Sequence, residues 1–152
     1  MSNSAPNSSA CNPFVGTWRL VSIDSGESRL FGESPVGVLM YDADGNVAVQ
    51  IMRNPRPEFA ANTMGFPTPK DLQVAYKGYY AYYGTYTIDA AVGHITHHLN
   101  GSLRPGDVGK DFVRAYTVTD RTLSLKPVND SQAKDACLNW ERAKQAAPSV
   151  SR

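Results

Sequence analysis

The sequence has few cysteines, no long apolar run and no excess of charge of one sign. Its 152 residues include 2 cysteines, and 15 basic and 14 acidic side chains leave a formal net charge of +1. Because no basic block stands out, the electrostatic footprint of a nucleic-acid-binding protein is missing. No stretch approaches the roughly 18 apolar residues that a membrane-spanning helix requires. We therefore expect neither a nucleic-acid partner nor a membrane partner.

The two cysteines, Cys11 and Cys137, lie far apart and lack the close spacing of metal ligands. The first 13 residues, MSNSAPNSSACNP, have neither the charged start nor the apolar run of a secretory signal peptide. These features predict two reduced thiols in a cytoplasmic protein. A disulfide that joins the N-terminal segment to the last strand is the alternative.

Composition predicts one folded domain with two tails. Hydrophobic residues make up 41% and charged residues 19% of the chain, which is typical of globular proteins. The Ser- and Asn-rich residues 1–13 are expected to be a disordered tail and residues 144–152 a flexible one. Residues 14–143 form the expected domain.

Within this domain the hydrophobic pattern mostly has a period of two, which is typical of β-strands. The expected strands are Phe14–Asp24, Gly37–Tyr41, Asn46–Arg53, Gly84–Asp89, His94–Leu103, Phe112–Thr119, Thr122–Lys126 and Ala136–Arg142. Short turns such as Asp44-Gly45 and Asp120-Arg121 connect consecutive strands, which favours an up-and-down antiparallel order. Eight such strands can close into a barrel that holds one small ligand. The predicted fold is therefore an all-β, eight-stranded barrel.

Residues 54–83 interrupt the strands and predict one short helix between strands three and four. Pro55, Pro57, Pro67 and Pro69 do not suit a central strand, while Thr68 followed by Pro69 and Asp71 has the pattern of a helix N-terminus. Five residues would share one face of this helix, and Gly84 could end it: Leu72, Ala75, Tyr76, Tyr79 and Tyr83. The helix is expected across one mouth of the barrel, either as a lid that contacts ligand or as a plug.

Two motifs and a longer stretch carry a family resemblance. Gly16-Thr17-Trp18 opens the first expected strand, and Trp140-Glu141-Arg142 closes the last. Further matching segments are Pro35–Tyr41, Gly45–Val47, Gly84–Asp89, His94–His98, Ser102–Pro105, Gly109, Arg114 and Leu123–Leu125. Together they resemble the bacterial and fungal lipocalin-like domain family of the calycin superfamily, over roughly residues 14–142. The resemblance implies a lipocalin-like barrel in which the Arg142 guanidinium stacks on Trp18. It implies small-molecule metabolism only in general terms, and it does not imply the transport role of secreted lipocalins.

The three histidines lie on one expected strand. Alternation places His97 on the same face as Ile95 and Leu99, so His97 should point inward, while His94 and His98 face outward. His94 and His98 are about 13 Å apart along a strand, too far for one ion, and His97 points the other way. No metal site is expected. His97 is either an ordinary interior histidine or a group that transfers protons or recognises ligand.

Arg114 is expected on the inner face of strand six, beside Phe112 and Tyr116. An interior arginine needs a carboxylate, a carbonyl or an anionic ligand as its partner. In the alternative, Val113 and Ala115 face inward and Arg114 is solvated.

The tyrosines are also clustered in the sequence: six of the eight lie in the segment from Tyr76 to Tyr86. They could line an aromatic pocket or pack the helix on the barrel, and Tyr86 is expected inside. The expected ligand-binding residues are Arg53, Tyr41, Tyr79, Tyr83, Phe112 and Tyr116.

Two functions follow from these residues. In the first, the barrel is a cofactor-independent isomerase, cyclase or lyase that acts on a hydrophobic secondary metabolite. His97 would be its acid or base, Arg114 its oxyanion or carboxylate partner and Tyr86 a positioning donor. In the second, the same residues orient a small hydrophobic or aromatic ligand in a non-catalytic carrier. A module with a filled core is a third reading, and the sequence leaves a homodimer open.

Overall fold

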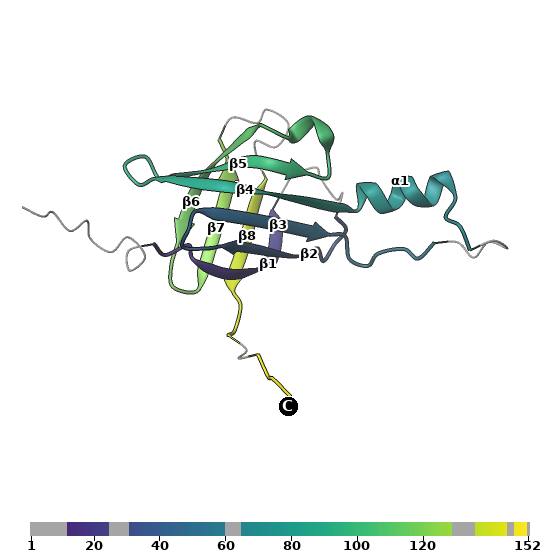
Figure 1. Cartoon of the computed structure of the whole chain (residues 1–152), viewed down its shortest axis with the longest axis horizontal. Coiled ribbons are helices and arrows are strands. Elements are labelled where there is room, and N and C mark those ends of the chain that lie inside the picture. Colours follow the sequence, from purple (N-terminus) through teal and green to yellow (C-terminus); the bar gives the residue numbers. More distant parts are fainter. Residues whose placement is uncertain (1–11, 25–30, 60–64, 129–135, 146–147, 152) are drawn as a thin grey trace, which may run out of the picture.

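Eight antiparallel strands follow one another around a closed barrel, in which each strand pairs with its neighbour in the chain and β8 returns to β1 (Figure 1). The computed structural model describes residues 12–24, 31–59, 65–128, 136–145 and 148–151. The strands are β1 Gly16–Asp24, β2 Val36–Tyr41, β3 Asn46–Met52, β4 Tyr79–Asp89, β5 His94–Ser102, β6 Asp111–Val118, β7 Thr122–Pro127 and β8 Cys137–Arg142. The predicted fold class is confirmed. Apart from the start of β4, the strand ends match the prediction or differ from it by one or two residues.

Local signals explain the turns and the helix. The Asp42 carboxylate accepts hydrogen bonds from the backbone N–H groups of Asp44 and Asn46, which holds the tight turn between β2 and β3. Helix α1, Pro69–Lys77, begins with the predicted capping box, in which Thr68 and Asp71 bond each other's backbone N–H groups. The connection between β5 and β6 contains a single turn of 3-10 helix, η2 Pro105–Asp107.

The predicted helical face is wrong at its C-terminal half. Helix α1 ends at Gly78, and β4 begins immediately at Tyr79, five residues before the expected start at Gly84. The run of tyrosines pairs with β3 from Met52 opposite Tyr79 onward. Aromatic side chains suit a half-buried pleated surface, and the pairing supplies ladder hydrogen bonds that a longer helix would forgo.

Gly84 serves a bulge in β4 instead of ending a helix. The register between β4 and β5 shifts between Tyr83 and Gly84. A Cβ atom at Gly84 would lie 1.8 Å from the carbonyl oxygen of His98, so only glycine allows the two strands to approach this closely.

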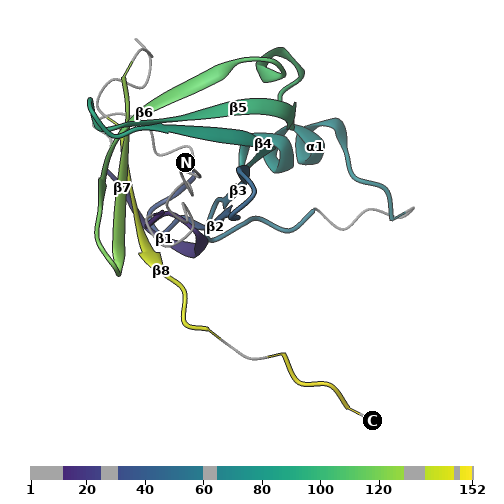
Figure 2. The same ribbon diagram turned by 60° about the vertical axis from the view of Figure 1, so that its left-hand side comes forward.

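Helix α1 extends beyond the barrel and does not cover a mouth (Figures 1 and 2). None of its residues is buried, and Leu72 and Tyr76 are 53% and 46% exposed. The expected positions as lid or plug are therefore both wrong in this structure. In the part of the chain that the structure describes, no helix has the length and apolar character needed to cross a membrane.

One end of the barrel is closed by Trp18, which is fully buried. The Arg142 guanidinium carbon lies 4.2 Å from the centroid of the Trp18 ring, which confirms the expected stacking. Arg142 also donates hydrogen bonds to the carbonyl oxygens of Pro13, Val15 and Asp120. Pro13, predicted as part of a tail, is thus held at this end, whereas residues 1–11, with Cys11 among them, lie outside the described residues.

Candidate functional site

His97 on β5 lies inside the barrel between two tyrosine hydroxyl groups. Its Nε2 is 2.7 Å from the hydroxyl of Tyr41 on β2, and its Nδ1 is 2.7 Å from the hydroxyl of Tyr82 on β4. His97 is 1% exposed, and both tyrosines are also buried. Alternation brings the three groups together, because each occupies an inward position of its strand. We call this group the Tyr–His–Tyr cluster.

The Tyr–His–Tyr cluster is electrically neutral at neutral pH. Burial, and after it the positive charge of Arg114, lowers the pKa of His97 to about 3. Burial raises the pKa of both Tyr41 and Tyr82, and in each case Arg114 acts in the opposite direction. His97 is therefore an uncharged imidazole, with one ring nitrogen as donor and the other as acceptor.

Counting hydrogens shows that this cluster has one donor in excess. A neutral imidazole carries one N–H and each tyrosine one O–H, so three hydrogens are available for two hydrogen bonds. Whichever tautomer His97 adopts, it donates to one tyrosine oxygen and accepts from the other. The tyrosine that accepts keeps its own O–H, which has no acceptor among the contacts of the described residues. The cluster can thus offer a hydroxyl donor to a ligand oxygen.

Arg114 lies on the inner face of β6, as predicted. It pairs with the fully buried Ile95 on β5, and its guanidinium carbon lies 4.9 Å from the centroid of the Phe112 ring. Its side chain is half-buried, and its charge acts on Tyr41, Tyr82 and His97. His97 and Arg114 thus both occupy inward positions of neighbouring strands.

The inner wall of the barrel differs between its two sides. Most inward side chains of β2 to β5 are buried almost completely, and Ile88 near the end of β4 is an exception at 37% exposed. Several inward side chains of β1, β6 and β8 pack on this core but keep part of their surface accessible, whereas Trp18 on β1 and Trp140 on β8 are buried. The half-exposed side chains include Leu20, Ile23, Phe112, Tyr116 and Leu138. Inward side chains that still contact solvent border space that the core does not fill. A ligand would therefore lie against this half-exposed wall, where Arg114 is found.

Tyr86 lies inside the barrel, but its hydroxyl group is already used. It donates to the Asp42 carbonyl oxygen at 2.7 Å and accepts from the Asn12 amide at 2.9 Å. Its ring packs on Tyr41, with 4.8 Å between the ring centroids. Because Asp42 begins the turn after β2, this hydroxyl faces the closed end of the barrel, and it has no donor proton left for a ligand.

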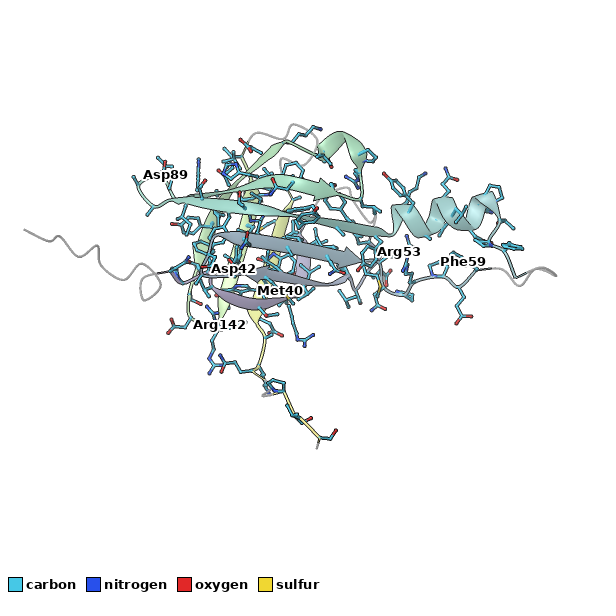
Figure 3. All side chains as sticks on the ribbon, viewed as in Figure 1. Met40, Asp42, Arg53, Phe59, Asp89 and Arg142 are labelled. Atoms are coloured by element: carbon cyan, nitrogen blue, oxygen red, sulfur yellow. The ribbon has the colours of Figure 1, made fainter. Side chains whose placement is uncertain are left out.

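Two of the expected ligand-binding residues lie away from the inner wall. Tyr79 and Tyr83 alternate with the inward positions of β4; Tyr79 donates to Gln50, and Tyr83 is 61% exposed over Gly101. Arg53 follows β3 beside α1, at the end of the barrel opposite Arg142 (Figure 3). The helical spacing of Tyr79 and Tyr83 predicts a helix, whereas both residues lie on strand β4. The other three, Tyr41, Phe112 and Tyr116, contact interior side chains.

Tyr82 is the main site residue that sequence reasoning missed. Its hydroxyl holds His97, and its ring packs at a right angle on Phe112 with 5.5 Å between centroids. The signal was present as the period-two series Tyr80, Tyr82, Gly84 and Tyr86, which continues the alternation of the following strand.

A second polar chain crosses the outer face of the barrel. His98 contacts the Thr87 hydroxyl at 3.0 Å through Nε2 and the Asp111 carboxylate at 2.7 Å through Nδ1. The order of hydroxyl, imidazole and carboxylate is that of a hydrolase triad, but it lies on exposed strands β4, β5 and β6 and links them like a cross-strand pair. Among the described residues, no three His, Cys, Asp or Glu side chains are grouped so that they could hold a metal ion.

A closed antiparallel barrel with a tryptophan–arginine pair at one end and polar groups enclosed within it defines a lipocalin-like barrel, a class that generally binds small hydrophobic molecules. The chain belongs to the lipocalin-like domain family, whose model matches residues 15–143. None of the curated proteins compared with the chain matches it. Among solved structures, an uncharacterized protein from Bacteroides eggerthii is similar at 13% identity, with a TM-score of 0.45, over 86% of this chain and 99% of that chain.

Proposed function

We propose that this barrel binds one small, largely apolar molecule in its interior, with the polar end of the molecule at Arg114 and the Tyr–His–Tyr cluster. The observation that carries the proposal is the half-exposed inner wall of β1, β6 and β8. Its apolar side chains would cover the body of a ligand, and the hydrophobic effect would supply most of the affinity. Arg114 and the excess hydroxyl donor would orient the ligand.

The proposal is tested by fluorescence titration with N-phenyl-1-naphthylamine, an uncharged apolar probe, and by native mass spectrometry of the freshly purified protein for a bound molecule. A variant should fill the interior: Leu20→Trp adds bulk at an inward, half-exposed position of β1. Its matched control is Val21→Trp, which adds a similar volume on the outer face, where Val21 is 55% exposed.

We expect saturable probe binding that Leu20→Trp weakens at least tenfold and that Val21→Trp leaves unchanged. Circular dichroism of both variants checks that the barrel is folded. Saturable binding that is equal in the two variants would place the site outside the barrel. If the original protein and both variants fail to bind the probe, and no molecule co-purifies, the barrel would be a module with a filled core.

The second candidate is a cofactor-independent isomerase, cyclase or lyase for a hydrophobic secondary metabolite. One observation favours it: Arg114 and the excess tyrosine O–H could both stabilise negative charge that develops on a substrate carbonyl oxygen. His97 is a weak base with its lowered pKa, so it would hold the donor in place instead of abstracting a proton at neutral pH. Tyr86 would contribute to packing, since its hydroxyl is engaged.

Catalysis is distinguished from carriage by incubating the co-purified molecule with the protein in D₂O. An enzyme that passes through an enol or enolate would incorporate deuterium at carbon, and Tyr82→Phe would slow the exchange while binding persists. A carrier would return the molecule unlabelled, and the same substitution would change affinity alone.

A further inference from the structure

Arg114 is an interior arginine without an acidic partner in the described part of the chain. The two ion pairs found there, His98–Asp111 and Lys110–Asp107, involve other residues. The guanidinium donates one weak hydrogen bond, from Nη1 to the carbonyl oxygen of the adjacent Val113 at 3.3 Å. A guanidinium has five N–H donors, so most of its capacity is unused by the described residues.

The strand neighbours of Arg114 are apolar. Its pairing partners on the neighbouring strands are Ile95 and Pro127, both buried, and its guanidinium lies near the ring of Phe112. A charge in such surroundings is costly unless a hydrogen-bonded counter-charge accompanies it. The planar fork of arginine matches the two oxygens of a carboxylate.

The sign and the amount of charge specify the ligand further. The polar groups on which Arg114 acts, Tyr41, Tyr82 and His97, are all neutral at neutral pH. Arg114 therefore brings one unit of positive charge that these groups do not balance. One guanidinium balances one negative charge, which favours a monoanionic carboxylate over a doubly charged phosphate.

We propose that the ligand is an organic acid with an apolar body, whose carboxylate binds the Arg114 guanidinium inside the barrel. This inference rests on the proposed function, since it names the chemical class that the same interior takes. The apolar body lies along the half-exposed wall that includes Phe112 and Tyr116. The excess hydroxyl of the Tyr–His–Tyr cluster provides a further donor for an oxygen of the acid.

The test compares 2-naphthoate with 2-naphthamide at neutral pH by isothermal titration calorimetry. The two molecules share one apolar body and differ in charge at one end. We expect the acid to bind roughly 10- to 100-fold more tightly than the amide, as charge-assisted hydrogen bonds contribute in such pairs. In Arg114→Met this preference should fall at least tenfold. Saturable binding of N-phenyl-1-naphthylamine to the variant checks that its interior still takes an apolar molecule.

Arg19→Met is the matched control, because Arg19 is exposed on the outer face of β1 and its removal changes net charge by the same amount. The preference for the acid should persist in this variant. If Arg114→Met does not fold, Arg114→Gln is used in its place. The comparison of 2-naphthoate with 2-naphthamide in the original protein needs no variant.

The possible failures are distinguishable. If the uncharged probe binds in the barrel while acid and amide bind equally, the ligand class is overturned and the proposed function stands. A preference for the acid that survives the loss of Arg114, or that disappears with Arg19, also overturns the assignment. If the probe, the acid and the amide all fail to bind, the proposed function itself is overturned.

Discussion

The guanidinium of Arg142 lies on the Trp18 ring, 4.2 Å from its centroid, and joins the end of β8 to the start of β1. The same side chain donates to three backbone carbonyl oxygens, those of Pro13, Val15 and Asp120. Arg142 thus holds together three parts of the chain. It binds the N-terminal segment and the turn between β6 and β7 through hydrogen bonds, and it stacks on the aromatic ring that fills this end of the barrel. The contact closes the barrel at the point where its first and last strands meet.

Removal of this side chain should therefore destabilise the whole barrel. We expect Arg142→Ala to lower the free energy of unfolding by about 2–4 kcal/mol, from the lost cation–π contact and charge-assisted hydrogen bonds. Arg142→Lys should lose less, because it keeps the charge without the planar fork. Urea unfolding measures both, with exposed Arg19→Ala as the control. A loss under 0.5 kcal/mol in Arg142→Ala would show that the contact does not hold the strands together.

Gly16 is the glycine of the Gly-x-Trp motif, and its role follows from the position of Arg142. Its φ of +132° favours glycine, and a Cβ atom there would lie 2.6 Å from Arg142 Nη1. We expect Gly16→Ala to cost about 1–3 kcal/mol of stability through strain and displacement of the guanidinium. Gly93→Ala separates the two effects, because Gly93 also has a positive φ but no atom near its Cβ position.

The cost of Gly16→Ala should shrink when Arg142 is already alanine, since the steric part is then gone. A double-mutant cycle by urea unfolding measures this coupling. Additive effects of the two substitutions would contradict the proposed contact between Gly16 and the guanidinium.

The strands, the closed end and the inward direction of His97 and Arg114 were predictable because alternation and the two terminal motifs are local signals. The partners of His97 were not, since Tyr41 and Tyr82 lie 56 and 15 residues away in sequence and meet His97 only after the barrel has closed. The prediction of where β4 starts was wrong for another reason. Helical spacing of Leu72, Ala75, Tyr76, Tyr79 and Tyr83 competed with the period-two series of Tyr80, Tyr82 and Tyr86, and pairing with β3 decided between them.

A cytoplasmic location, as expected from the sequence, would keep both cysteines reduced. Cys137 is a free, half-buried thiol at the start of β8, 3.7 Å from the Asn139 side-chain oxygen. We expect thiol titration under non-reducing conditions to find two thiols per denatured chain, from Cys137 and Cys11. Recovery of none before reduction and two after it would indicate a disulfide and an oxidising compartment.

His97 should make stability depend on pH. Its pKa is about 3 in the folded protein, against 6.5 as its ordinary value, so between these limits the unfolded chain binds a proton that the folded protein does not. Unfolding is therefore favoured as the pH falls. The contribution of His97 is fully present above pH 6.5 and is lost progressively toward pH 3, with a slope approaching about 1.4 kcal/mol per pH unit.

The measurement is urea unfolding of the original protein and of His97→Gln from pH 7.5 to pH 4. Glutamine can still bond both tyrosines but does not titrate, and His94, His98 and all the carboxylates remain in both proteins. We expect the original protein to be the more stable at pH 7.5 and its advantage to narrow as the pH falls below 6.5. Because the carboxyl of Asp42, whose pKa is also lowered, is shared by the two proteins, its acid effect cancels in the difference. Parallel curves over this range would mean that His97 accepts a proton inside the barrel as readily as in water, and the buried Tyr–His–Tyr cluster would then have to be open to solvent.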